Sequence, residues 1–122
     1  MSNPKPLAVV IEPRSPLAGT LAEALHANGF EVLVASTHAG AARLVAQSKV
    51  DFLIAAIPAP GEDHAGAYLE EARGKNPALA VVVMLSDPNE ATDGAPASAV
   101  HLIKPFDRVQ LEAAIRQAMH TI

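Results

Sequence analysis

Short apolar runs alternate along the chain with longer segments in which apolar residues are spaced three or four positions apart. Five of the short runs are rich in valine, isoleucine, leucine and alanine, and this pattern is typical of strands buried on both faces. They cover residues 7–11, 30–35, 52–57, 79–85 and 100–103. The spaced segments cover residues 16–28, a stretch from about 38, residues 62–73 and a stretch from 107, and they predict amphipathic helices.

The first and last predicted helices carry clear end signals. Gly29 follows residues 16–28, where a left-handed residue commonly ends a helix. Asp107 and Gln110 have the spacing of a capping box, in which each side chain bonds the backbone N–H of the other residue. Phe106 and Leu111 stand at the positions of a hydrophobic staple. The buried stripe of this last helix is expected to be Leu111, Ala114, Ile115, Ala118 and Ile122.

The segment between the fourth and fifth strands differs from the other connections. Asp87, Pro88 and Glu90 form a strong helix start, but Gly94 and Pro96 follow almost at once. No large apolar residue lies between Pro88 and the fifth strand. The fourth helix is therefore expected to be short or disordered.

Strands that alternate with helices predict βαβ units and a parallel sheet covered on both faces. The 122 residues suffice for one domain, and five repeats in this length fit a flavodoxin-like α/β fold with strand order 2-1-3-4-5. In such a sheet, ligands bind beyond the carboxyl ends of the strands. Glu12, Ser86 and Lys104 are expected there, with Asp63 on the rim.

Composition narrows the classes of function. The chain has no cysteine, which excludes disulfides, thiol catalysis and thiolate metal sites. Its net charge is −4 and its basic residues are scattered, so direct nucleic-acid binding is not expected. The amino terminus lacks the apolar run of a signal peptide, and no stretch is long enough for a membrane span. A cytoplasmic protein that contacts neither nucleic acid nor membrane is the expectation.

Three segments resemble the receiver domains of two-component response regulators. They are His101-Leu-Ile-Lys-Pro-Phe-Asp107, the third-strand segment from Asp51 to Gly61, and Val82-Val-Met-Leu-Ser86. The resemblance covers essentially the whole chain, so residues 1–122 are expected to form one receiver-like domain. In that family an aspartate at the end of the third strand accepts a phosphoryl group, and an acidic pair after the first strand binds Mg²⁺.

The resemblance also indicates a degenerate site. The phosphoacceptor position falls on Ala56, which has no nucleophile, and the acidic pair falls on Glu12 and Pro13. The residues that would contact the phosphoryl group are Ser86 and Lys104, the latter followed by Pro105. Because Mg²⁺ prefers several oxygen ligands, its binding is expected to be weak or absent. No catalytic residue, metal site or cofactor is therefore expected.

Each of these residues also has a simpler interpretation. Lys104 is expected to pair with Glu12 as a structural salt bridge, since a charge left in a half-buried site needs a partner. Ser86 can cap the helix that follows it. His101 stands at the family's switch position, where an aromatic residue is usual, but a half-exposed strand histidine is the more frequent case.

The sequence thus favours a pseudo-receiver, a non-enzymatic signalling module that acts by protein–protein contact independently of phosphorylation. The contact is expected with a protein partner or a second copy, through the region around the fifth strand and the last helix. The alternative is a sensor that binds a small ligand, nucleotide or metal in the crevice. A phosphoacceptor displaced to Asp51 or Asp63 is a weaker hypothesis, because Asp51 precedes its strand and Asp63 follows a double-proline turn.

Overall fold

The computed structural model describes residues 5–12, 15–35, 38–56, 74, 76–85 and 99–120. The strands are β1 (Leu7–Ile11), β2 (Glu31–Ala35), β3 (Phe52–Ala56), β4 (Ala80–Leu85) and β5 (Val100–Ile103). The helices are α1 (Ser15–Ala27), α2 (His38–Gln47) and α4 (Arg108–His120). The predicted helix over 62–73 and the segment over 86–98, predicted to hold the short fourth helix, lie outside the described residues.

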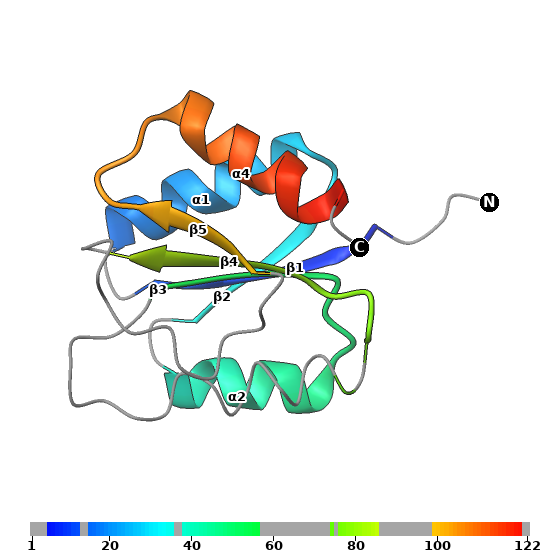
Figure 1. Cartoon of the computed structure of the whole chain (residues 1–122). Coiled ribbons are helices and arrows are strands. Elements are labelled where there is room, and N and C mark those ends of the chain that lie inside the picture. Colours follow the sequence, from blue (N-terminus) through cyan, green and yellow to red (C-terminus); the bar gives the residue numbers. More distant parts are fainter. Residues whose placement is uncertain are drawn as a thin grey trace.

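The strands form one parallel sheet in the order β2-β1-β3-β4-β5. Figure 1 shows α1 and α4 on one face of this sheet and α2 on the other. The flavodoxin-like α/β fold expected from the sequence is therefore confirmed. In the described part of the chain, α1 connects β1 to β2 and α2 connects β2 to β3, and each of these crossovers returns the chain to the same end of the sheet, as parallel pairing requires.

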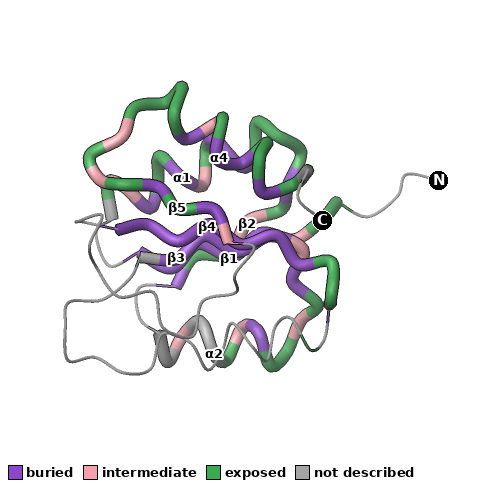
Figure 2. The backbone as a smooth tube through the Cα atoms, in the orientation of Figure 1, coloured by how far each residue is buried: buried purple, intermediate pink, exposed green. Residues whose placement is uncertain are grey.

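Side chains from alternate strand positions separate into two hydrophobic cores, because successive strand residues point to opposite faces. The larger core joins one face of the sheet to Leu21 and Leu25 of α1 and to Leu111 and Ile115 of α4. The smaller core lies on the other face, where Val45 of α2 packs against the strands. Burial is nearly continuous along the central strands (Figure 2), as their unbroken apolar runs predict.

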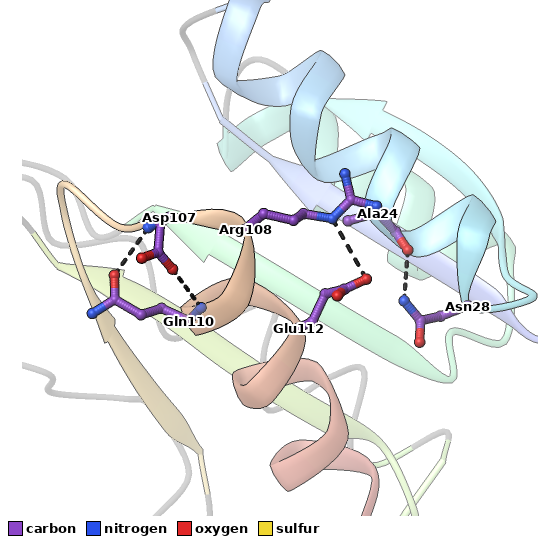
Figure 3. A network of polar contacts seen from close by, with 6 residues as sticks. All are labelled: Ala24, Asn28, Asp107, Arg108, Gln110 and Glu112. Carbon is purple, nitrogen blue, oxygen red and sulfur yellow. Dashed lines mark hydrogen bonds and ion pairs between the residues drawn. The ribbon is translucent and has the colours of Figure 1, made fainter.

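The predicted helix ends are present where the structure describes them. Gly29 has a φ of 91°, the left-handed conformation expected at the end of α1. Both bonds of the capping box form at α4: the Gln110 backbone N–H donates to Asp107 Oδ1 at 2.7 Å, and the Asp107 N–H donates to Gln110 Oε1 at 2.9 Å (Figure 3). Phe106 packs against the core that contains Leu111, as the staple requires.

A buried polar cluster at the amino ends of the strands was not predicted. The Asp51 carboxylate accepts a hydrogen bond from the Leu7 N–H at 2.9 Å and one from the Asn76 side-chain amide at 3.3 Å. The Asn76 amide also donates to the Val50 carbonyl at 3.1 Å. These bonds tie the start of β3 to β1 and to the segment that enters β4, so they help set the register of the central strands.

Candidate functional site

The carboxyl ends of the strands bring Glu12, Ala56 and Lys104 to one edge of the sheet. Glu12 follows β1, in which Ile11 pairs with Ala55 of β3, so the register places Glu12 level with Ala56. Lys104 follows β5, in which Ile103 pairs with Leu85 of β4. Of the residues that the sequence assigned to one site, Glu12, Ala56 and Lys104 therefore lie at the same edge of the sheet.

Glu12 is fixed at this edge by its backbone and is fully enclosed by protein. Its N–H donates to the Ala35 carbonyl at 3.1 Å, which continues the β1–β2 ladder by one residue. The residue is 1% exposed, and its side chain is completely buried. A carboxylate taken out of water in this way needs strong partners, because its lost hydration must be replaced by protein groups.

Lys104 supplies one such partner. Its Nζ lies 2.6 Å from Glu12 Oε1, at the short end of the range for a charge-assisted hydrogen bond. Its backbone N–H donates to the Leu85 carbonyl at 2.7 Å, so the residue is anchored to β4 before its side chain reaches across the edge. The salt bridge expected between Glu12 and Lys104 is therefore present.

The two charged groups differ in their access to solvent. The Lys104 side chain is 23% exposed, whereas the Glu12 side chain is not exposed at all. The lysine side chain thus keeps contact with water, whereas the carboxylate does not. A solute can therefore approach the lysine side chain more easily than its buried partner.

The structure places some of the other residues that the sequence assigned to this site, and others lie outside the described residues. The backbone of Ala56 ends β3 at the expected edge, opposite Met84. Pro105 is exposed and follows a cis peptide bond from Lys104. His101 lies on β5, pairs with Val83 and is exposed. Pro13 and Ser86 lie outside the described residues, so their place in the site stays a prediction.

Two further expectations concern alternative sites. Asp51 lies at the amino end of β3, the opposite edge of the sheet from Glu12, and its carboxylate is bonded to backbone and to Asn76. This position speaks against a phosphoryl acceptor at Asp51, while Asp63 lies outside the described residues.

Within the described ranges, no three His, Asp or Glu side chains gather closely enough to hold a metal ion. Among the same residues, no helix combines the length and apolar character of a membrane span.

Asn76 is a buried polar residue with several hydrogen bonds, and the sequence analysis did not predict its role. It is 7% exposed, and its side-chain oxygen accepts a hydrogen bond from the Ala78 N–H at 3.1 Å, so it also holds the turn before β4. The available signal was an asparagine before Pro77 at a strand entrance, a common turn pattern. That pattern predicts the turn but not the long-range bonds to Val50 and Asp51.

The fold is that of response-regulator receiver domains in solved structures. A response regulator receiver protein from Sinorhizobium medicae superposes with a TM-score of 0.83 at 20% identity, over 98% of both chains. The signal receiver domain of an HD domain-containing protein from Pseudomonas fluorescens gives 0.76 at 22% identity, over 99% of this chain and 92% of that one.

A third solved structure carries the phosphorylated form of such a protein. It is a response regulator from Burkholderia pseudomallei with a phosphorylated aspartic acid, a calcium ion and citrate; its TM-score is 0.71 at 24% identity, over 93% of this chain and 66% of that one. No family model and no curated protein matches the sequence. The likeness to known proteins is therefore a likeness of fold.

Proposed function

We propose that this chain is a receiver-like signalling module that has lost phosphoryl transfer and acts by binding another protein. The observation that carries the proposal is the 2.6 Å ion pair between Lys104 and Glu12 at the carboxyl edge of the sheet. Glu12 lies level with Ala56, which is at the position where receiver domains have the aspartate that accepts the phosphoryl group. The lysine that would contact a phosphoryl group already has a buried counter-ion.

The chemistry of the residues supports the loss of transfer. An acyl phosphate forms when a carboxylate oxygen attacks phosphorus, and the methyl group of Ala56 cannot do this. Mg²⁺ would need more than one oxygen ligand beside Glu12, and the adjacent Pro13 has no side-chain donor. The structure from Burkholderia pseudomallei, with its phosphorylated aspartic acid, represents the chemistry that this chain is proposed to lack.

Without phosphorylation, recognition at the protein surface would carry the signal. The proposed contact surface comprises β5 and α4, where Ile103 is 37% exposed, Met119 43% and Val109 73%. The module is proposed to be non-enzymatic, to need no cofactor and to work in the cytoplasm. Any switching would come from the differential binding of a partner to two states of the domain.

The first test is an amide NMR titration with Mg²⁺ and beryllofluoride, a mimic of the phosphoryl group. Resonances of Glu12, Ala56, Lys104 and their neighbours are expected to stay in place. Saturable shifts confined to these residues would overturn the proposal, because they would show that the edge still binds a cation together with a phosphoryl-like group.

A second test restores the missing group. Ala56→Asp is compared with Ala56→Asn, which has nearly the same shape but no carboxylate. If the scaffold has lost only its acceptor, a small phosphodonor with Mg²⁺ will phosphorylate the Asp variant and leave the Asn variant unmodified, as intact mass will show. If the Asp variant also stays unmodified, the decay of the site extends to the residues beside Glu12. Phosphorylation of the unaltered chain itself would refute the proposal.

A small-ligand sensor is the second candidate, and the unequal exposure of the ion pair favours it. The Lys104 side chain is 23% exposed beside a fully buried carboxylate, so a small anion in the crevice could compete for the ammonium group. The same NMR titration, run with nucleotides and inorganic phosphate in place of beryllofluoride, distinguishes the two candidates. Saturable shifts at Lys104 would favour the sensor.

A further inference from the structure

The edge strand β2 has the largely apolar sequence Glu-Val-Leu-Val-Ala over Glu31–Ala35. It is the first strand of the sheet, and among the described residues only β1 pairs with it. Leu33 is 38% exposed and Val34 is 49% exposed. Because these neighbours point to opposite faces, both sides of the edge present apolar surface.

The register shows which backbone groups face outward. The Glu31 N–H donates to the Pro6 carbonyl, and the Ala35 carbonyl accepts from the Glu12 N–H, so both residues direct these groups toward β1. In a parallel ladder such residues alternate with residues whose N–H and C=O point the other way. Val32 and Val34 therefore direct their backbone donors and acceptors away from the sheet.

The opposite edge of the sheet is protected in a way that β2 is not. The Lys104 N–H donates to Leu85, so the outward positions along β5 and its continuation are His101, Ile103 and Pro105. Proline has no N–H to offer, and charged residues and prolines are common devices that keep edge strands from pairing. Along β2 the sole charge is Glu31, at the start of the strand.

We infer that β2 pairs with β2 of a second copy of this chain, in antiparallel register about a two-fold axis at Leu33. Val32 then faces Val34 of the second copy, and the outward groups of both residues exchange hydrogen bonds. The same register sets Glu31 opposite Ala35 of the second copy, so the two acidic side chains avoid each other. The β-branched valines form cross-strand pairs on the α1 face, and the two Leu33 side chains meet on the α2 face.

This interface is independent of the ion pair at the strand ends and separate from the surface of β5 and α4. It is isologous and closed, since each β2 edge is used once, and it joins the two sheets into one continuous sheet. Its strength rests on one short strand from each copy, so the dimer should dissociate on dilution.

The test begins with sedimentation of the whole chain over a wide concentration range. The wild type is expected to shift from monomer to dimer as concentration rises, and Val34→Lys is expected to remain monomeric because it places a charge against Val32 of the second copy. The matched control is Ala78→Lys: Ala78 is exposed in the turn before β4, away from β2 and from the surface of β5 and α4, so this variant should dimerise like the wild type. Circular dichroism checks that both variants are folded.

A single cysteine tests the register. In the inferred pairing the two Leu33 Cα atoms form a non-hydrogen-bonded pair about 4.5 Å apart, which a disulfide can span. The chain has no other cysteine, so Leu33→Cys should cross-link to a covalent dimer under mild oxidation, whereas Ala78→Cys should not. A wild type that stays monomeric at all concentrations, open-ended aggregates, or dimers that Val109→Lys on the surface of β5 and α4 abolishes while Val34→Lys does not, would each overturn the inference.

Discussion

The ion pair between Lys104 and Glu12 predicts an asymmetric response to mutation. Lys104→Met removes the Lys104 ammonium group from the Glu12 carboxylate, whose side chain is fully buried. Breaking a buried pair in this way costs about 3–5 kcal/mol in general, and we expect about 3 kcal/mol, because the lysine side chain is partly exposed. Glu12→Gln instead leaves a charge on the partly exposed lysine side chain, so about 1 kcal/mol is expected, the net value of one hydrogen bond.

Urea unfolding followed by circular dichroism measures these free energies, provided that the slope of free energy against urea is the same in all variants. The double variant Glu12→Gln/Lys104→Met removes both charges and should lose less stability than Lys104→Met alone. Arg108→Met is the control, since Arg108 Nε and Glu112 Oε1 lie 3.5 Å apart on the α4 surface (Figure 3), with side chains 47% and 35% exposed. Its loss should stay under about 0.5 kcal/mol. The reasoning is refuted if Lys104→Met and Glu12→Gln lose equal stability.

Four further predictions concern the scaffold, and thermal or urea unfolding tests each. Gly19→Ala should stabilise by about 0.5–1 kcal/mol, because Gly19 lies inside α1 and an added Cβ meets nothing within 4 Å; a loss would refute this. Gly29→Ala has the same open space but should destabilise by about 1 kcal/mol, because its φ is 91°. Asp107→Ala should lose about 1 kcal/mol with the capping box, and an unchanged midpoint would contradict that role. Asn76→Leu should lose about 2 kcal/mol by leaving the Val50 carbonyl and the Ala78 N–H without their partner; retention of stability would show that water replaces it.

Local signals in the sequence were sufficient for much of the fold. The apolar runs located all five strands to within a residue or so, because a strand covered on both faces needs apolar residues at successive positions. The capping box at Asp107 and Gln110 and the left-handed Gly29 were also readable, since each depends on residues only a few positions apart. The edge of the sheet that gathers Glu12, Ala56 and Lys104 followed from the general geometry of parallel α/β sheets.

The tertiary structure alone decided how groups far apart in the chain meet. The sequence offered Lys104 and Glu12 as partners, but the 2.6 Å contact and the unequal burial of the two side chains depend on how residues 92 positions apart are brought to the same edge of the sheet. It gave no reason to expect Asn76 to join Asp51, because long-range hydrogen bonds leave no local pattern. Nor did it reveal that Val32 and Val34 turn their backbone groups outward on β2, because that direction follows from the register of pairing with β1 and not from the residues themselves.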